Sequence, residues 1–365
     1  MKKKNVLFFV SGEVGGAERI TITIAKLLNK SEFNVKLIIT DFPNCPLSKF
    51  APIDIPTIYL SKKHLRLGCM IKMKNLLKQE KAEYAFASMT FVCILLLVIC
   101  KFFTPKVKPI IRGQINPHYW VKHTGWMKYK GLVIEKVNRL LYPTAYKVVA
   151  QTPMMRDGMI KYFGVKSEKC ICLYNPIDKL NINEKIKAEN PYSQKNGNCF
   201  RYVAVGRCQY QKGFDLLIKS MKKVVSYNPQ SHVYIVGDKS NDTTYWNYLM
   251  QLINDFNLEN NIHFTGFQSN PYKYIKHADC FVLSSRDEGL PNVLIEATYL
   301  HKQSIAYTCI PIIEEIIQDG VNGFLVEPEN VDKLAEAMIK IQLLDLNVAS
   351  KYKPSNDKDF NKLFE

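Results

Sequence analysis

Short apolar segments alternate with amphipathic segments from one end of the 365-residue chain to the other. The short segments are rich in β-branched and aromatic residues, as buried strands are, whereas the longer segments carry the apolar spacing of helices. This alternation predicts an α/β protein built on parallel sheets. The expected strands are residues 6–10, 35–40, 84–88, 109–112, 147–150, 202–205, 233–236, 262–264, 280–283, 304–307 and 324–326. The expected helices are residues 17–29, 70–79, 91–100, 131–141, 214–226, 244–256, 292–300 and 332–343.

A polar, turn-rich segment divides this pattern into two halves and has the composition of a linker. Two doubly wound domains joined there would face each other across a cleft, and ligands of such sheets bind at the carboxyl ends of the strands. The expected organisation is a first domain over residues 1–179, a linker over 180–199, a second domain over 200–345 and a helical segment over 346–365 that packs back on the first domain.

The positive charge of the chain lies entirely in its first half. Residues 1–179 contain 30 Lys and Arg against 11 Asp and Glu, whereas residues 180–365 contain 20 against 22. Nucleic acid and acidic lipid headgroups are the anionic partners that such a surface could meet, and charge that only maintains solubility is the alternative. Cations are interleaved with Phe, Trp, Tyr and Leu at residues 62–74, 101–108 and 120–136, which suits a membrane interface.

The cysteines and the apolar segments indicate the cellular compartment of the protein. Ten cysteines are scattered without a Cys-x-x-Cys pair, mostly in apolar segments, which indicates a reducing compartment. The apolar run at the amino terminus fits a strand better than a signal peptide. Residues 91–103 are too short for a membrane span, which takes about 20 residues. A cytoplasmic protein that associates peripherally with the inner face of the cytoplasmic membrane is expected.

The segment SSRDEGLPNVLIEA, residues 284–297, carries the most specific chemistry. Glu288 and Glu296 stand eight positions apart, the first in a loop and the second in the helix that follows. Backbone N–H groups at the start of that helix, at Gly289, Leu290 and Asn292, would favour an anion such as a diphosphate. Acceptors for sugar hydroxyls and donors for phosphate therefore lie side by side, as a sugar nucleotide requires.

Two further strand ends carry matching features. Gly206 allows close approach of a ligand, and Arg207 with Lys212 brings two cations that would neutralise the charge developing on a diphosphate. In the first domain, Gly15 and Gly16 offer bare backbone at a helix start, where a phosphate or a sugar ring could rest. The spacing of these glycines is not that of a dinucleotide-binding motif.

The motifs VGRCQYQKGFDLLIKS, SSRDEGLPNVLIEA and GGAER together resemble those of the retaining GT-B glycosyltransferases of family 4. The resemblance runs from residue 6 to about residue 341 and is strongest over 202–326. It implies two Rossmann-like domains, a nucleotide-sugar donor held mainly by the second, and no essential metal or other cofactor. It also implies that Arg207 and Lys212 hold the diphosphate, that Glu288 contacts the donor sugar near the reacting centre, and that Glu296 binds the ribose hydroxyls.

The resemblance assigns further contacts. Gly289 and Leu290 would assist with sugar and phosphate, Gly266 and Phe267 would accommodate the base, and Gly15 and Gly16 would close over the donor. Many members aim a histidine of the first domain at the donor sugar, for which His118 is the candidate and His123 the runner-up. Arg112 and Asn116 are placed on the acceptor side. The loop at 308–314 lacks the glycines that the family often has there, so no ligand contact is assigned to it.

A metal-dependent transferase would carry Asp-x-Asp at a strand end. The match at residues 357–359 has no strand before it and is interpreted as a solvated helix start, and the seven histidines show no paired metal spacing. The resemblance therefore implies transfer of a hexose or N-acetylhexosamine from a UDP-sugar to a polyprenyl-diphosphate-linked glycan of a lipopolysaccharide or capsule. The alternatives are a sugar-nucleotide epimerase or hydrolase of the same fold, and a basic nucleic-acid-binding protein, which lacks a reading element here.

Overall fold

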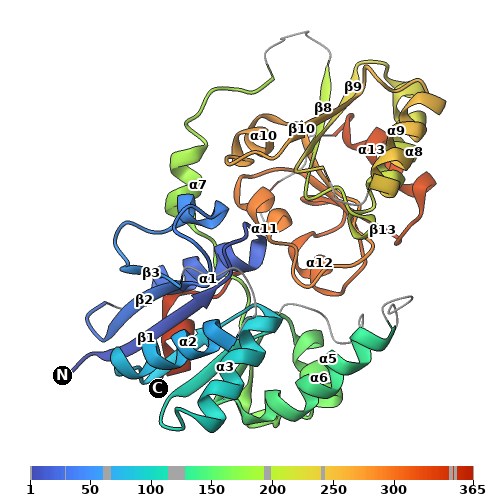
Figure 1. Ribbon diagram of the computed structural model, residues 1–365. Coiled ribbons are helices and arrows are strands. Elements are labelled where there is room, and N and C mark those ends of the chain that lie inside the picture. Colours follow the sequence, from blue (N-terminus) through green and yellow to red (C-terminus); the bar gives the residue numbers. More distant parts are fainter. Residues whose placement is uncertain are drawn as a thin grey trace. The chain divides into compact units, whose positions relative to one another are not determined.

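The computed structural model describes residues 2–28, 30–60, 67–113, 128–192, 199–239, 243–344, 348 and 352–364, with the backbone alone at 67 and 128–134 (Figure 1). The chain forms two compact units. The first comprises Met1–Pro176 together with Pro354–Glu365, and the second comprises Ile177–Lys353. Within the described ranges no helix is both long and apolar enough to cross a membrane.

The first unit is built on a parallel seven-stranded sheet with the order β3-β2-β1-β4-β5-β6-β7. The strands are β1 Lys4–Val10, β2 Phe33–Ile39, β3 Thr57–Tyr59, β4 Tyr84–Ala87, β5 Lys108–Arg112, β6 Lys147–Ala150 and β7 Cys170–Cys172. The helices are α1 Gly16–Leu27, α2 Leu67–Gln79, α3 Thr90–Phe102, α5 Lys128–Leu141, α6 Pro153–Phe163 and α14 Asp357–Asn361. Short 3₁₀ turns are η1 Pro46–Phe50, η2 Tyr142–Thr144, η3 Ser167–Lys169 and η5 Lys362–Phe364.

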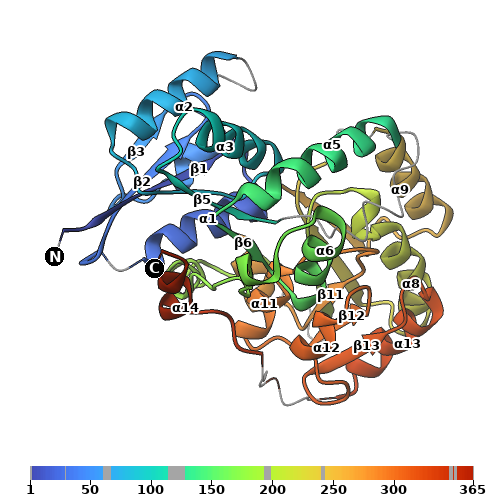
Figure 2. The same cartoon turned by 90° about the horizontal axis from the view of Figure 1, so that it is seen from below.

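Both faces of this sheet are covered, which explains why its central strands β1 and β4 are almost continuously apolar rather than alternating. Leu7 and Phe9 of β1 face a core formed with α2, α3 and α6, whereas Phe8 and Val10 face a second core formed with α1. Figure 2 shows α2 and α3 on one side of the sheet and α1 on the other.

The end of the chain completes the second of these cores. Phe364 is fully buried there, with its ring centroid 5.6 Å from that of Phe33 and 5.5 Å from that of Tyr84. The Asn356 side chain caps α14 and Asp359 returns a bond to the cap, so the Asp-x-Asp match is a helix start, as interpreted from the sequence. The last residues thus belong to the first unit.

The second unit is built on a parallel six-stranded sheet with the order β10-β9-β8-β11-β12-β13. The strands are β8 Phe200–Val205, β9 Ser231–Val236, β10 Ile262–Gly266, β11 Cys280–Leu283, β12 Ser304–Tyr307 and β13 Gly323–Val326. The helices are α7 Lys179–Lys185, α8 Phe214–Tyr227, α9 Thr243–Asp255, α10 Tyr272–His277, α11 Asn292–Tyr299, α12 Ile312–Ile316 and α13 Val331–Ile341, with the 3₁₀ turn η4 Tyr210–Lys212.

The α/β fold class with two Rossmann-like parallel sheets is confirmed. Each strand expected from the sequence is present with ends within two residues of the expected ones. The short strands β3 and β7 were missed, as was α6, although Thr152 caps it and Pro153 stands at its first turn. The expected linker begins with a helix, α7, because the Asp178 side chain caps it and Lys185 bonds the Ser269 carbonyl of the second unit.

Candidate active site

The candidate site of the second unit lies where β8 and β11 end. These strands are parallel neighbours at the centre of the sheet, so the loops that follow them leave the same edge side by side. One loop, residues 206–213, carries the expected diphosphate-binding cations, and the other, residues 284–291, carries the first glutamate. The structure therefore brings together residues that stand about 80 positions apart in the chain.

Lys212 and Glu288 form an ion pair across these loops. The Lys212 Nζ lies 2.7 Å from Glu288 Oε1, and the Ser285 hydroxyl donates to the same oxygen at 2.7 Å. Glu288 is only 7% exposed, so its charge needs these partners. Arg207 is exposed at the end of β8, and the stem of Lys212 passes over Gly206.

Gly213 allows the two loops to touch. Its φ of 62° lies in the left-handed region, and a Cβ added there would overlap the carbonyl oxygen of Ser284. The Ser284 hydroxyl in turn donates to the Lys212 carbonyl at 3.0 Å. The backbone on both sides of Lys212 is thus held against the loop that carries the glutamate.

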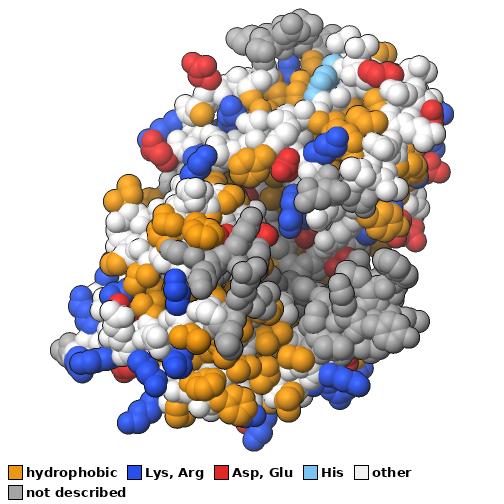
Figure 3. Space-filling model, in the orientation of Figure 1, with side chains coloured by type: hydrophobic (Ala, Val, Ile, Leu, Met, Phe, Trp, Pro, Cys, Tyr) orange, Lys and Arg blue, Asp and Glu red, His pale blue; other side chains and the backbone are white. Residues whose placement is uncertain are grey.

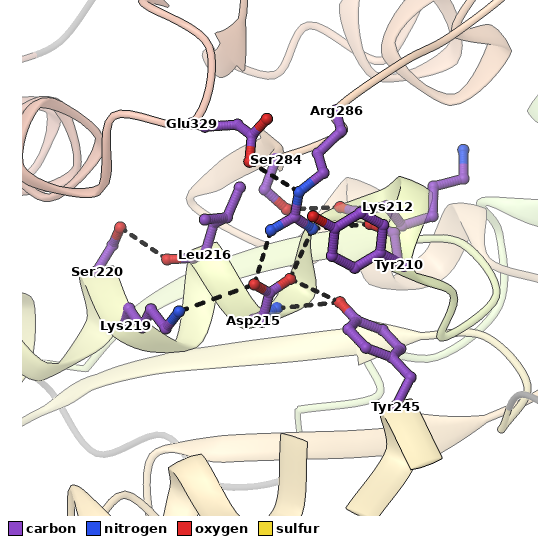
Figure 4. Close-up of polar contacts among 10 residues, drawn as sticks. All are labelled: Tyr210, Lys212, Asp215, Leu216, Lys219, Ser220, Tyr245, Ser284, Arg286 and Glu329. Atoms are coloured by element: carbon purple, nitrogen blue, oxygen red, sulfur yellow. Dashed lines mark hydrogen bonds and ion pairs between the residues drawn. The ribbon is translucent and has the colours of Figure 1, made fainter. Parts of the chain in front are cut away.

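A second ion pair joins the loop of residues 284–291 to the start of α8, and the sequence did not reveal it. The Arg286 guanidinium donates from Nη1 and Nη2 to the two oxygens of Asp215, each at 2.8 Å, and from Nε to Glu329 at 2.9 Å (Figure 4). The guanidinium also stacks on the Tyr210 ring at 3.9 Å, and Tyr245 donates to Asp215 at 2.8 Å. Both charged residues stand inside the quoted motifs, but their pairing depends on a contact across 71 positions.

Two carboxyl groups near the site have shifted pKa values. Burial alone would raise the pKa of Asp215, but the hydrogen bonds from Arg286 and Tyr245 lower it below its usual value. Burial and the neighbouring charge of Glu288 raise the pKa of Asp287 to about 7. Burial, followed by the charges of Glu288 and Asp287, also raises the pKa of the Cys309 thiol, which places the loop after β12 near the site.

The remaining predicted donor contacts lie on β10, on α11 and in the segments next to them. Glu296 lies on α11 and accepts a hydrogen bond from the hydroxyl of the buried Tyr272 at 3.1 Å. Gly266 ends β10 with a φ of 68°, and Phe267 after it is 55% exposed. Gly289 and Leu290 stand between Glu288 and the start of α11, and the Leu290 side chain is buried.

In the first unit, Gly15 caps α1 and Gly16 begins it. A Cβ on Gly15 would lie 2.6 Å from an oxygen of Glu18, which is buried and accepts a hydrogen bond from Ser11 at 2.7 Å. A side chain at Gly15 would require the Glu18 carboxylate to shift, so the glycine leaves room for that carboxylate.

Arg112 belongs to a buried polar network at the carboxyl ends of β5, β6 and β7. Its guanidinium donates to Asn175, whose amide donates to Gln151 at 3.1 Å, and burial lowers the pKa of Arg112 to about 9. Asn116, His118 and His123 lie outside the described residues. Among the residues that are described, no group of three His, Cys, Asp or Glu could hold a metal ion.

Two parallel, doubly wound sheets have the architecture of the glycosyltransferases of the GT-B fold. The family models agree with this class: Glycosyltransferase Family 4 matches residues 14–179, and Glycosyl transferases group 1 matches residues 185–355. The chain belongs to this family, as its motifs indicated.

Two relatives whose names specify an activity are bacterial transferases. The chain is 26% identical to the N-acetylgalactosamine-N,N'-diacetylbacillosaminyl-diphospho-undecaprenol 4-alpha-N-acetylgalactosaminyltransferase of Campylobacter jejuni, over 97% of this chain and 93% of the relative. It is 24% identical to the UDP-Gal:alpha-D-GlcNAc-diphosphoundecaprenol alpha-1,3-galactosyltransferase of Escherichia coli, over 90% of this chain and 85% of that relative. An uncharacterised glycosyltransferase of Methanocaldococcus jannaschii is 34% identical over 56% of this chain, which spans 50% of that relative.

Solved structures share the fold over nearly the whole chain. The Anabaena HepE complex with UDP and glucose superposes with a TM-score of 0.77 at 21% identity, covering 98% of this chain and 97% of that one. A point mutant of Staphylococcus aureus TarM, solved in a complex that includes UDP, has a TM-score of 0.74 at 13% identity, covering 99% of each chain.

Proposed function

We propose that this glycosyltransferase moves a hexose or N-acetylhexosamine from a UDP-sugar, with retention of configuration, to a polyprenyl-diphosphate-linked glycan in the synthesis of a surface polysaccharide. The observation that carries the donor proposal is the Lys212–Glu288 pair at the carboxyl ends of neighbouring strands. The acceptor proposal is supported by the Campylobacter and Escherichia relatives, whose names specify undecaprenol-linked acceptors.

In this reaction the bond between the anomeric carbon and the diphosphate breaks, and UDP leaves with the electron pair. Arg207 and Lys212 stabilise the negative charge that develops on the leaving diphosphate, so the reaction requires no metal. Glu288 accepts hydrogen bonds from the donor sugar, and Glu296, held by Tyr272, accepts them from the ribose hydroxyls. The acceptor hydroxyl forms the new bond to the anomeric carbon and passes its proton to the leaving diphosphate.

Thermal stabilisation by nucleotides tests the donor. At a concentration of about 100 times its dissociation constant, UDP is expected to stabilise the protein by about 2.7 kcal/mol. Glu296→Gln and Lys212→Met are expected to lose most of this effect. Lys223→Met is the matched control, because its Nζ pairs with Asp332 on the exposed surface. Stabilisation by another nucleotide and not by UDP would overturn the donor assignment.

Product analysis tests the transfer. UDP release from a UDP-sugar is expected to depend on a lipid-linked acceptor, and the anomeric configuration of the product, measured by NMR, is expected to match that of the donor. Equal release of UDP and free sugar without an acceptor would identify a hydrolase instead. An inverted product would refute the retaining mechanism while leaving the donor site intact.

A further inference from the structure

We propose that Arg112 and the two amides beside it, Gln151 and Asn175, form an anion-binding site in the first unit that holds a phosphate group of the acceptor's diphosphate. The site, called the Arg112 site below, lies where β5 and β6 end and just beyond β7. This inference rests on the proposed function, because the diphosphate belongs to the lipid-linked acceptor. The sequence pattern places Arg112 on the acceptor side but does not indicate which chemical group it binds.

The Arg112 guanidinium is buried without a counterion. Arg112 is 3% exposed, whereas the Lys and Arg side chains that Figure 3 shows on the first unit lie at the surface, where water screens their charge. Of the ionisable groups that the structure describes, only the Cys93 thiol acts on the pKa of Arg112, and burial keeps that thiol neutral by raising its own pKa to about 12. Burial lowers the pKa of Arg112 to about 9, so the guanidinium is still charged at neutral pH. A buried cation of this kind is costly unless an anion joins it.

Part of the guanidinium also lacks a hydrogen-bond partner. Its Nη2 donates to the side-chain oxygen of Asn175, whereas its buried Nη1 has no partner within the described ranges of the chain. The amides beside it are bonded to other groups: Asn175 donates to Gln151 at 3.1 Å, and Gln151 donates to the Gly113 carbonyl. The N–H groups of Nη1 are therefore the donors left for a ligand. A planar guanidinium matches the oxygens of a phosphate group.

The start of α6 adds to the positive potential at this edge of the sheet. The helix begins at Pro153, two residues after Gln151, so the positive end of its dipole lies at the carboxyl end of β6. A Cβ at Gly113 would overlap the Met159 methyl group, which shows that the end of β5 packs against the same helix. Thr152 already caps the first turn, so the helix contributes its field rather than free donors. A cation held near this helix end is stabilised further by an anion.

A purely structural role for Arg112 is the alternative. Asn175, which accepts its hydrogen bond, stands next to the last residue before the second unit begins, so Arg112 could serve only to hold this segment. A neutral side chain could donate to the same oxygen without the cost of a buried charge. The cation therefore favours an anionic ligand. Its place at the carboxyl edge of the sheet, where ligands of doubly wound domains bind, favours a substrate.

Calorimetry with inorganic pyrophosphate tests the site on the full chain, with UDP present at about 100 times its dissociation constant so that the donor site is occupied. The wild type is expected to bind pyrophosphate. Arg112→Gln is expected to bind it at least about tenfold more weakly, which is the usual contribution of a hydrogen bond to a charged group. Arg112→Lys keeps the charge but not the fork and is expected to be intermediate. Arg139→Gln, on the exposed face of α5, is the matched control and is expected to bind like the wild type.

A second variant supplies the missing anion from the chain itself. Asn175→Asp places a carboxylate where the guanidinium already donates, so it is expected to fold and to bind pyrophosphate at least about tenfold more weakly. The new ion pair offsets the lost bond to Gln151, and the melting temperature is expected to stay near that of the wild type. Asn34→Asp, exposed on β2, adds the same charge away from the site and is expected to bind pyrophosphate like the wild type. This pair of variants keeps the test decisive if Arg112→Gln does not fold.

Initial rates with the lipid-linked acceptor distinguish the acceptor's diphosphate from a free phosphate effector. At saturating UDP-sugar, pyrophosphate is expected to raise the KM for the acceptor and to leave kcat unchanged. Arg112→Gln is expected to raise the same KM, with little change in kcat or in the KM for the donor, and to weaken inhibition by pyrophosphate. Inhibition that lowers kcat at an unchanged acceptor KM would identify a separate effector site and overturn the acceptor assignment.

Two results of the binding experiment would overturn the Arg112 site: no pyrophosphate binding by the UDP-saturated wild type, or wild-type affinity in both Arg112→Gln and Asn175→Asp. The UDP-induced thermal shift reports separately on the donor site. Its absence from a wild type that binds pyrophosphate through Arg112 would refute the proposed donor and spare the Arg112 site. Its presence without pyrophosphate binding would do the reverse.

Discussion

Replacing Arg286 with Met is expected to destabilise the second unit by about 3 kcal/mol. Asp215 is 3% exposed and Arg286 is 10% exposed in its side chain, so the substitution leaves a buried carboxylate without its bidentate partner. Breaking such a pair typically costs about 3–5 kcal/mol. The lower end applies here because Tyr245 still donates to Asp215 and Lys219 lies 4.0 Å from it. A unit of this size would melt about 6–12 °C lower.

Denaturant unfolding measured for the single and double variants tests this reasoning. If the cost arises from the uncompensated charge, D215N/R286M is expected to be more stable than R286M alone, with a coupling energy of about 1–3 kcal/mol. Arg286→Lys is expected to recover part of the loss, because it keeps the charge but not the fork or the stacking on Tyr210. A change below about 1 kcal/mol for R286M, as exposed ion pairs show, would refute the argument.

The pH dependence of the free energy of unfolding tests the same argument. Because the pKa of Asp215 is lowered in the folded state, its ion pair contributes stability above the ordinary value of 3.8, and this contribution disappears as pH falls through the lower folded value. The stability difference between the wild type and R286M is therefore expected to be constant from neutral pH down to about 5 and to shrink in more acidic solution. A difference that grows on acidification would contradict it.

Three further substitutions test the two loops of residues 206–213 and 284–291. Gly213→Ala is expected to abolish the thermal shift with UDP because its Cβ would push the two loops apart, whereas Gly320→Ala, with a φ of 71° and open space around it, costs only about 1 kcal/mol of stability. Ionisation of Asp287 as pH rises through about 7 is expected to weaken UDP binding, measured by calorimetry, and Asp287→Asn is expected to remove this pH dependence. Wild-type and variant affinities that change in parallel with pH would refute this prediction. Glu288→Gln is expected to bind UDP more tightly, since Lys212 is freed for phosphate, and to lose transfer; weaker UDP binding would contradict this.

The sequence predicted those parts of the structure that depend on local pattern. The central strands β1 and β4 are almost continuously apolar because helices cover both faces of their sheet, so their positions could be recognised from the local sequence. Lys212 and Glu288, which the structure joins in an ion pair, were singled out because each stands in a short motif at a strand end. Residues whose role depends on distant contacts could not be found in this way. Asp215 and Arg286 pair across 71 positions, and Phe364 reaches a core that begins at the opposite end of the chain.

The Lys212–Glu288 pair explains how one site can hold opposite charges. A carboxylate that is 7% exposed is costly unless paired, and the lysine beside it supplies the partner. A sugar diphosphate presents an anion and hydroxyl donors on adjacent atoms, so it can replace each member of the pair with a better-matched partner. The Lys212 side chain is 21% exposed, whereas that of Glu288 is 9% exposed, so the lysine is the member that can turn toward a phosphate. Under the proposed donor assignment, the same contact that joins the two loops favours a ligand that carries both features.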